Sequence, residues 1–510
     1  MHILQKFVTI YKDKNNGWLH QLLIVFIAFG IIASAINLLN DRSLWLDEIM
    51  LATSIVNRSF IELLQPLEMD QVAPIGFLFV EEFFTTLFNN KDWSFRLFPF
   101  FSFLLSIILI YTLSKQLFKS TTIALLSCAL FSLNLNILLY AIEVKQYIVD
   151  VFISLLVVVS ALHFQKHQHN KSLILFTVVS ILSVWFSNIA VIMLFTVGLY
   201  ILFKMYFKNP ERDYKGFIPI IFSAISFFIY YAIFIHEHPA REHMLEYWTD
   251  MRGFLYKDLF SYNFNYFIYS RTRTILEWLI AIDSYFWFIT LGFIIIGVLA
   301  NLKLRKALFI TLLPIGIHLT LSYFKLYPFQ TRLALYLFPF LIILLSAGLW
   351  VTYLFFKRFS IKISVFILLI PLLCNAIAVA KNTPKEHEEI KKSMQYINTN
   401  IDRSDAILVY SSSKIHFNYY KSKFPNIINN QFIHYGIEFD YDNNTLKHLE
   451  VFNNLTEKIW IVFSHTKKEE KVGYNEEHLT INHIRHLGFK LLSKKKYTGS
   501  SVYEMTKINP

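Results

Sequence analysis

"WLHQLLIVFIAFGIIASAINLLNDRSLWLDEIMLAT", residues 18–53, begins with a long run that contains no acidic residue, lysine or arginine and carries the adjacent carboxylates Asp47 and Glu48 near its end. A run of about twenty apolar residues is long enough to cross a bilayer as a helix. It is too long for the apolar part of a cleaved signal peptide, and similar blocks follow it along the chain. The stretch therefore predicts a membrane helix that is followed directly by an acidic motif.

The rest of the chain repeats this apolar pattern. Of the 510 residues 55% are hydrophobic and only 16% are charged, whereas soluble proteins contain about 45–50% apolar and about 25% charged residues. Blocks of about twenty apolar residues alternate with short basic loops, which predicts about eleven spans. The expected spans are 18–39, 97–113, 121–141, 147–164, 171–186, 189–207, 217–236, 276–300, 307–324, 333–355 and 362–381.

The sidedness of the chain follows from its Lys and Arg residues. With these spans, the N-terminus and every short basic loop lie in the cytoplasm, as the positive-inside rule requires. A further crossing at 74–90 would reverse this pattern, so we expect that block to be an amphipathic helix at the outer interface, with Glu81 and Glu82 towards water. The net charge of +12 is explained by the loops and the polar tail, and it does not indicate nucleic acid.

The fold expected from these features is a polytopic α-helical membrane protein with a small C-terminal α/β domain outside the cytoplasm. Residues 1–382 would form the transmembrane catalytic domain, with a first outer loop at 40–96, and residues 383–510 the soluble domain. In that tail "EEIKKSMQYINTN" and "YNEEHLTINHIRHLGF" predict helices, and "AILVYSS", "KIWIVFSH" and "SSVYEMTK" predict strands. Cys128 and Cys374 both lie in apolar blocks and indicate neither a disulfide framework nor a metal site.

Polar side chains gather in the segments that this topology places outside. They are Asp47 and Glu48 after the first span, Asp70 and Gln71 in the first outer loop, Glu143, Lys145 and Tyr147 at the turn between the third and fourth spans, Arg271 and Arg273 before the eighth, and Gln330 and Arg332 between the ninth and tenth. Any one of them is explained by a solvated anchor at the lipid headgroups. Acids, amides and cations at a single depth instead indicate a functional site.

The chemistry that suits such a site is displacement of a phosphate carried by a lipid. A carboxylate removes the proton of an acceptor hydroxyl, and Lys, Arg or a divalent cation offsets the charge on the departing phosphate. The sequence contains no Gly-rich nucleotide-binding loop. A lipid-linked donor would also explain how the reaction proceeds outside, where nucleotides are scarce.

The chain resembles the GT-C superfamily of membrane glycosyltransferases that use polyprenyl-phosphate sugars. The resemblance is to the glycosyltransferase 39 or protein mannosyltransferase-like family, which is related to the lipid A aminoarabinose transferase. It rests on the order and spacing of "SLWLDEIMLAT", "DQVAPIGFLFVEEFFTTLF", "DWSFRLFPFFSFLLSIILIYTLSKQLF", "LLYAIEVKQYIVD" and "YPFQTRLALYLFP", and it covers residues 15–350. It implies an inverting transfer at the outer face of the inner (plasma) membrane, with the N-terminus in the cytoplasm.

By this resemblance Asp47 is the general base, and Glu48 either supports it or binds the acceptor. Lys145 and Arg332 would bind the donor phosphate. Arg271 and Arg273 either guide that phosphate or anchor a helix. Asp70, Gln71, Glu143, Tyr147 and Gln330 would support the site or bind the acceptor. Lys145 and Gln146 stand where relatives more often have Arg and Pro, and Asp70-Gln71 replaces a His-Pro-Pro or Glu-Lys motif, which leaves the role of Asp70 open.

The implied partners are a polyprenyl-phosphate sugar, a glycan, lipid or protein acceptor and membrane lipids, with no nucleic acid. The implied cofactor is at most a divalent cation, Mg²⁺ or Mn²⁺, for which Asp47 and Asp70 are candidate ligands, and no nucleotide. Two other functions remain open. A ligase or polymerase of lipid-linked glycans would share the outer site, and a lipid-sugar transporter or flippase would share the many spans.

Overall fold

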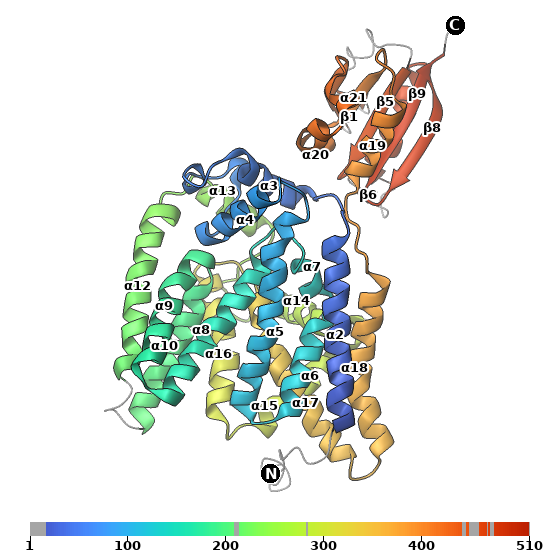
Figure 1. Cartoon of the computed structure of the whole chain (residues 1–510). Coiled ribbons are helices and arrows are strands. Elements are labelled where there is room, and N and C mark those ends of the chain that lie inside the picture. The colour runs from blue at the N-terminus through green and yellow to red at the C-terminus, as the bar shows by residue number, and fades with distance from the viewer. Residues whose placement is uncertain are drawn as a thin grey trace. The chain divides into compact units, whose positions relative to one another are not determined.

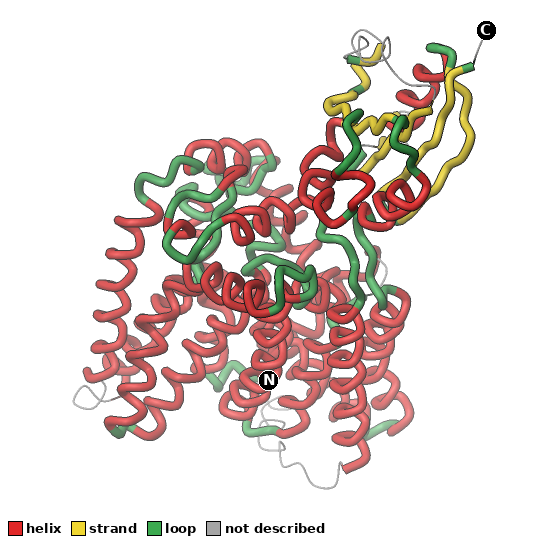
Figure 2. Tube along the Cα trace, turned by 45° about the horizontal axis from the view of Figure 1, so that its top comes forward, coloured by secondary structure: helices red, strands yellow, loops and turns green. Residues whose placement is uncertain are grey.

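The computed structural model describes residues 17–208, 214–281, 284–440, 445–447, 458–466, 468–469, and 474–508. Packing divides the chain into two compact units. The first contains Met1–Leu39 and Arg58–Pro384, and the second contains Asn40–Asn57 and Lys385–Pro510. Figure 2 shows that strands occur in the second unit, whereas the first is built from helices and loops.

The first unit is a bundle of apolar helices, and the protein is a multi-pass membrane protein (Figure 1). Within the described residues, seven helical segments are long and apolar enough to cross a membrane: Gly17–Leu39, Ser94–Phe118, Tyr147–His167, Tyr214–Ile235, Arg305–Tyr323, Leu335–Phe356 and Ile361–Lys381. Shorter apolar helices fall in the remaining expected spans. The helices are α2 (Gly17–Leu39), α4 (Ile75–Leu87), α5 (Leu97–Phe118), α6 (Thr121–Ser132), α7 (Leu135–Tyr140), α8 (Tyr147–His167), α9 (Asn170–Phe186), α10 (Ala190–Lys208), α12 (Phe217–Tyr230), α13 (Arg241–Asp250), α14 (Tyr262–Leu279), α15 (Trp287–Ala300), α16 (Arg305–Tyr323), α17 (Phe338–Phe356) and α18 (Ile361–Lys381).

Helix α17 is the most buried of the long helices. In its apolar segment, 94% of the residues are buried inside the unit. It packs against α15 through two glycines. A Cβ added to Gly348 would lie 1.8 Å from the Phe293 carbonyl oxygen, and one added to Gly297 would lie 2.2 Å from the Leu344 carbonyl oxygen. Small residues let membrane helices approach this closely. The glycines therefore fix the crossing of α15 and α17.

Two of the expected spans are broken, so those predictions were wrong in detail. The span 121–141 is divided into α6 and α7, because the Asn134 side chain accepts the Ile137 N–H at 3.0 Å and starts a new helix. The span 276–300 is divided into α14 and α15. The end of α14 is held by Asn375 of α18, whose Oδ1 accepts the Ala281 N–H at 2.7 Å. Polar side chains thus satisfy backbone groups that each break releases.

A third expectation, that Glu81 and Glu82 of α4 both face water, is wrong for Glu81. Glu82 is partly exposed, but Glu81 is completely buried. Ile75, Leu78 and Glu81 share one stripe of the helix because residues three and four apart lie on the same face, and that stripe packs against the protein. Burial raises the pKa of the Glu81 carboxyl well above its usual range.

The second unit is a five-stranded sheet with strand order β2-β1-β5-β9-β8. Strand β1 is parallel to β2 and β5, and β9 is antiparallel to β5 and β8. The strands are β1 (Ala406–Tyr410), β2 (Ile433–Ile437), β3 (Phe439–Asp440), β4 (Thr445–Leu446), β5 (Lys458–Ser464), β6 (Lys468–Glu469), β7 (Tyr474–Asn475), β8 (Phe489–Tyr497) and β9 (Ser500–Lys507). Its helices are α3 (Leu46–Asn57), α19 (Ile390–Asn400), α20 (Lys414–Tyr420), α21 (Pro425–Ile428) and α22 (Glu476–His486).

Each helix and strand expected in the tail is present, and the α/β character of the tail is confirmed. The segment 40–57 is the difference from the sequence-based division. The sequence places it in the first outer loop of the membrane part, whereas α3 and the residues before it pack with the C-terminal sheet domain. The acidic motif therefore belongs structurally to the second unit.

Candidate active site

The acidic motif forms the first turn of α3. Trp45 precedes the helix, and its carbonyl accepts the Ile49 N–H at 2.9 Å. Three residues later, the Glu48 carboxylate returns to accept the Trp45 N–H at 3.1 Å. This is the reciprocal half of a capping box, which satisfies a backbone donor that a helix start leaves open. Asp47 and Glu48 also lie where the helix dipole favours negative charge.

Glu48 is tied into the fold by Arg42. The Arg42 Nη1 and Nη2 atoms donate to the two carboxylate oxygens at 2.7 and 3.0 Å, and the side chains are 5% and 0% exposed. A guanidinium matches a carboxylate in this two-point geometry. Of the two roles that the sequence left open for Glu48, this arrangement favours support of Asp47 over acceptor binding.

Asp47 itself is only partly buried. Its charge is near enough to His465 to act on that side chain. The pKa of His465 is raised chiefly by its hydrogen bond to Glu388, against the opposing effect of burial, and the charges of Glu388, Asp47 and Glu476 add to this. Asp47 is thus an accessible carboxylate next to a buried, paired one.

A second group of predicted residues lies in the helical unit, at the end where α8 and α17 begin. We call this the Tyr147 end. The turn before α8 carries Glu143 and Lys145, which are both buried. Lys145 Nζ donates to Gln71 Oε1 at 2.7 Å. The structure therefore brings together Gln71 and Lys145, which lie far apart in the sequence.

Arg332 lies over two aromatic rings at the same end. Its guanidinium carbon is 6.0 Å from the Tyr147 ring centroid and 5.3 Å from that of Trp248. Cations over aromatic faces are attracted by the ring quadrupole. The pairing of Tyr147 with Arg332 joins two of the predicted residues, whereas sequence reasoning did not identify the third member, Trp248 in α13.

The turn that carries Arg332 is fixed by a buried histidine of α16. His318 Nε2 lies 3.1 Å from the Pro328 carbonyl oxygen, and the Tyr336 hydroxyl lies 3.1 Å from Nδ1. Because the carbonyl only accepts, Nε2 carries the proton and Nδ1 accepts from Tyr336. His318 therefore binds both sides of the turn at once. Sequence reasoning missed it, because a lone histidine in an apolar helix carries no distinguishing pattern.

The other predicted residues have local partners. Arg271 Nη2 donates to the Arg252 carbonyl at 2.9 Å, and Gln330 Nε2 donates to the Met251 carbonyl at 3.1 Å. Arg273 pairs with Glu277 one turn further along α14, at 2.7 Å. Arg271 and Gln330 thus hold the loop after α13. The pairing of Arg273 fits the helix-anchoring alternative better than phosphate guidance.

Asp70 lies in a tight turn, where Met69 and Asp70 both have positive φ angles. Its Oδ2 is 3.2 Å from His243 Nδ1, and both side chains are more than half exposed. Within the described ranges, no group of three or more His, Cys, Asp or Glu side chains is suited to hold a metal ion. Asp70 and His243 supply two donors without a third, so we derive no step through a metal. The divalent cation stays a prediction.

Comparison with known proteins shows a family match to part of the chain and a shared fold. Residues 72–235 match the family model described as dolichyl-phosphate-mannose-protein mannosyltransferase. The matched range contains Lys145 and Tyr147. ArnT from Cupriavidus metallidurans, solved bound to undecaprenyl phosphate, superposes with a TM-score of 0.54 at 12% identity, covering 96% of this chain and 98% of that chain. The chain therefore shares the fold of ArnT, and residues 72–235 resemble this family.

A second structure of ArnT shows the same likeness. The apo structure of ArnT from the same organism gives a TM-score of 0.52 at 11% identity over 95% of this chain and 98% of that one. No curated protein matches the chain. The fold that this chain shares with ArnT therefore extends over nearly the whole length of both chains, at a sequence identity that shows the fold alone.

Proposed function

We propose that this protein is an inverting glycosyltransferase of the GT-C superfamily that moves a sugar from a polyprenyl phosphate to an acceptor hydroxyl on the extracytoplasmic face. One observation carries the proposal. Lys145 and Arg332 are held by side-chain contacts at one end of a helical unit, in a chain that shares its fold with ArnT over 96% of its length. Fixed cations of this kind suit the phosphate of a lipid-linked donor.

The proposed reaction is a single displacement. Asp47 accepts the proton of the acceptor hydroxyl, and that oxygen forms a bond to the anomeric carbon of the sugar. The bond between the anomeric carbon and the phosphate oxygen breaks, and the electron pair leaves with the polyprenyl phosphate. Lys145 and Arg332 offset the charge on that phosphate, and Glu48 holds the helix start that carries Asp47.

The orientation belongs to the same proposal. The basic loops place the N-terminus in the cytoplasm by the positive-inside rule. The Tyr147 end and the C-terminal domain then lie outside the inner (plasma) membrane. A lipid-linked donor supplies an activated sugar on that side without a nucleotide.

The test uses the full chain reconstituted in liposomes. Undecaprenyl-phosphate-linked hexoses and pentoses are supplied in turn as donors, with an extract of envelope lipids and glycans as the acceptor, and released undecaprenyl phosphate is measured. We expect Asp47→Asn to lower the release rate by about 100-fold or more, the range for loss of a general base. Asp250→Asn, an exposed carboxylate at the end of α13, is the matched control and keeps the wild-type rate.

The phosphate-binding role has a separate measurement. Lys145→Met is expected to weaken binding of undecaprenyl phosphate by about tenfold or more, because a hydrogen bond from a charged donor is lost. Lys325→Met, an exposed lysine in the turn before Arg332, is the control. Equal binding by both variants would contradict the phosphate role of Lys145.

The product separates the alternatives. Release of a lipid diphosphate in place of a monophosphate indicates a ligase or polymerase of lipid-linked glycans. Movement of the intact lipid-linked sugar across the liposome membrane, with no release, indicates a flippase. Full activity of Asp47→Asn would exclude Asp47 as the base while leaving the donor class intact.

A further inference from the structure

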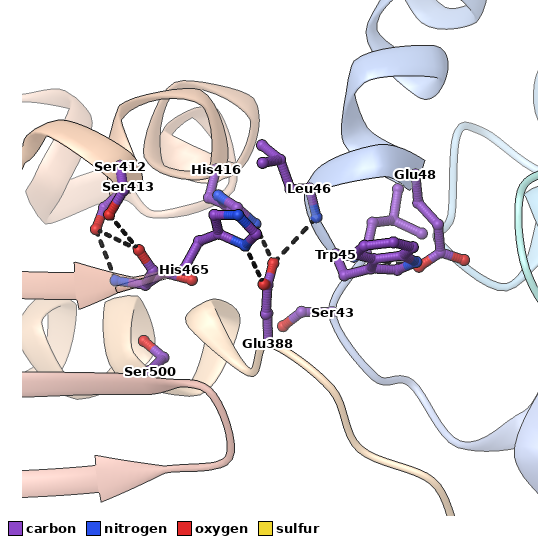
Figure 3. Close-up of polar contacts among 12 residues, drawn as sticks. Ser43, Trp45, Leu46, Glu48, Glu388, Ser412, Ser413, His416, His465 and Ser500 are labelled. Atoms are coloured by element: carbon purple, nitrogen blue, oxygen red, sulfur yellow. Dashed lines mark hydrogen bonds and ion pairs between the residues drawn. The ribbon is translucent and has the colours of Figure 1, made fainter. Parts of the chain in front are cut away.

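The residues that lead into α3 direct their backbone N–H groups at side chains of the C-terminal domain. The Leu44 N–H donates to the Tyr420 hydroxyl at 2.7 Å. The Leu46 N–H donates to Glu388 Oε2 at 3.0 Å (Figure 3). Leu46 directly precedes Asp47, and its N–H is one of the donors that a helix start leaves without an intrahelical partner. The beginning of α3 is therefore capped from a sequence distance of more than 300 residues.

Glu388 is itself held between two histidines. His416 Nε2 lies 2.6 Å from Glu388 Oε2, and His465 Nδ1 lies 2.6 Å from Oε1. An ionised carboxylate only accepts hydrogen bonds, so both rings donate to it. Figure 3 shows the carboxylate between the two rings and Leu46. We call Glu388, His416 and His465 the His–Glu–His clamp.

Hydrogen bonds at the ends of the strands hold the clamp in place. Ser413 Oγ accepts the Ser464 N–H at 2.6 Å, which joins the residue before His465 to the segment that leads into α20. The Glu389 N–H donates to the Thr498 carbonyl at 2.8 Å. Gly499 makes this approach possible, because a Cβ there would lie 2.4 Å from the His387 carbonyl oxygen. Glu388 is thus fixed by its backbone as well as by its carboxylate.

Further contacts hold the segment before α3 on the same domain. The Trp45 ring stacks on His387 with centroids 4.9 Å apart. The Lys391 N–H donates to Ser43 Oγ at 3.1 Å, and Lys391 Nζ pairs with Asp41 at 2.8 Å. These contacts hold Asp41, Ser43 and Trp45 on the C-terminal domain, and they restrict the backbone that leads to Asp47.

We propose that Glu388 is a positioning residue that fixes the Leu46 backbone and thereby orients the Asp47 carboxylate, which makes the C-terminal domain a working part of the active site. The proposal rests on the proposed function, because it assigns Glu388 to the same Asp47 base. A domain that only covered the site would have no need to receive the backbone donors on the approach to Asp47. Catalytic groups need this kind of support, since a displacement of about 1 Å lowers the rate by about 100-fold.

The test compares Glu388→Gln with Glu386→Gln in the full-length protein. Glu386 lies two residues away and pairs with Lys392 on the surface. The glutamine at 388 keeps the size of the side chain but cannot accept from both histidines and Leu46 at once. We expect its kcat for undecaprenyl phosphate release to fall at least about tenfold, with a donor KM within about twofold, since the phosphate-binding residues are unchanged. Glu386→Gln retains the wild-type kcat.

Hydrogen exchange gives a readout that does not depend on activity. The peptide containing residues 43–48 is expected to exchange at least about tenfold faster in Glu388→Gln than in the wild type, because a bond from an N–H to a charged group is lost. Tyr420→Phe removes the acceptor of the Leu44 N–H and tests how the C-terminal domain holds this segment, without touching Glu388. Tyr435→Phe, which loses only a surface bond to Asn418, is its control.

The outcomes separate this inference from the proposed function. Wild-type kcat in Glu388→Gln, together with an inactive Asp47→Asn, overturns the positioning role and leaves the base intact. Wild-type exchange of the 43–48 peptide in both Glu388→Gln and Tyr420→Phe also overturns it. Faster exchange with full activity in both Asp47→Asn and Glu388→Gln shows that the proposed base is wrong although the clamp holds the segment. If Glu388→Gln does not fold, the Tyr420→Phe pair decides.

Discussion

The buried pair of Arg42 and Glu48 gives a prediction whose size follows from the structure. Glu48→Leu removes both carboxylate oxygens that Arg42 contacts at 2.7 and 3.0 Å, and it leaves a guanidinium that is only 5% exposed. Breaking one side of a buried ion pair costs about 3–5 kcal/mol. A folded domain has about 5–15 kcal/mol in total, so the second unit would lose a large part of its stability.

The double variant Arg42→Met/Glu48→Leu is expected to recover most of this loss. Replacing both partners of a buried pair by apolar residues is often neutral. One cost remains, because the Trp45 N–H loses its acceptor, which is worth about 1–3 kcal/mol when the donor is buried. The single variant Glu48→Leu should therefore be less stable than the double variant by about 2 kcal/mol, the difference between the midpoints of these two ranges.

The assay is thermal unfolding of the full chain in lipid nanodiscs, followed by proteolytic cleavage mapped to residues 385–510. For a domain of this size, about 1 kcal/mol corresponds to about 2–4 °C in Tm. We expect Glu48→Leu to lower the transition of the second unit by about 6–20 °C, and the double variant to regain part of that shift. The Arg42→Met variant completes the cycle. Additive effects of the two single changes would refute the reasoning, because they would show that the side chains are not coupled.

The remaining predictions concern packing, pH and the aromatic pocket. Gly348→Ala is expected to destabilise the helical unit by about 1–3 kcal/mol through overpacking, whereas Gly316→Ala, which meets no atom within 4 Å, leaves its Tm unchanged; a common Tm for both variants contradicts the glycine crossing. The pKa of His465 is raised and that of Glu388 is lowered, since hydrogen bonds from both histidines outweigh burial there. The His465 contribution is then complete below the ordinary histidine pKa of about 6.5 and is lost as the pH rises through the raised value. We expect the Tm of the second unit to fall as the pH rises above about 6.5 and through the raised pKa of His465, and His465→Gln to reduce that fall; an unchanged slope in the variant speaks against the pairing. Trp248→Ala is expected to weaken undecaprenyl phosphate binding by about 2–30-fold, from a cation–π contribution of about 0.5–2 kcal/mol to Arg332, and equal affinity would remove the tryptophan from the site.

The helical fold could be predicted because its signal is local. Apolar blocks with basic ends fix where the helices lie, and the helices found in the structure occupy the expected segments. The predictions failed where distant side chains intervene. Asn375 of α18 accepts a backbone N–H just after the end of α14. No pattern within residues 276–300 indicates that the span breaks there. Glu81 was misplaced because the adjacent carboxylates of Glu81 and Glu82 appear alike until the packed stripe of α4 is known.

The candidate site was predictable to the extent that single segments carry it. The turn with Lys145 and Tyr147 and the turn with Arg332 were found from their residue types. Trp248 and His318 were missed, because their roles arise only when α13 and α16 meet that turn. The clamp was missed for the same reason in a stronger form. Its three members come from separate parts of the tail and act on a segment near the other end of the chain.

The packing of residues 40–57 with residues 385–510 has a consequence for biosynthesis. A ribosome makes the acidic motif early and the sheet that receives it last, with the membrane helices between them. The motif therefore waits, without its final partners, while the helices are inserted one after another. A chain whose synthesis stops before Glu388 lacks the acceptors for the Leu44 and Leu46 N–H groups. Synthesis of the C-terminal domain thus becomes the condition for an ordered Asp47.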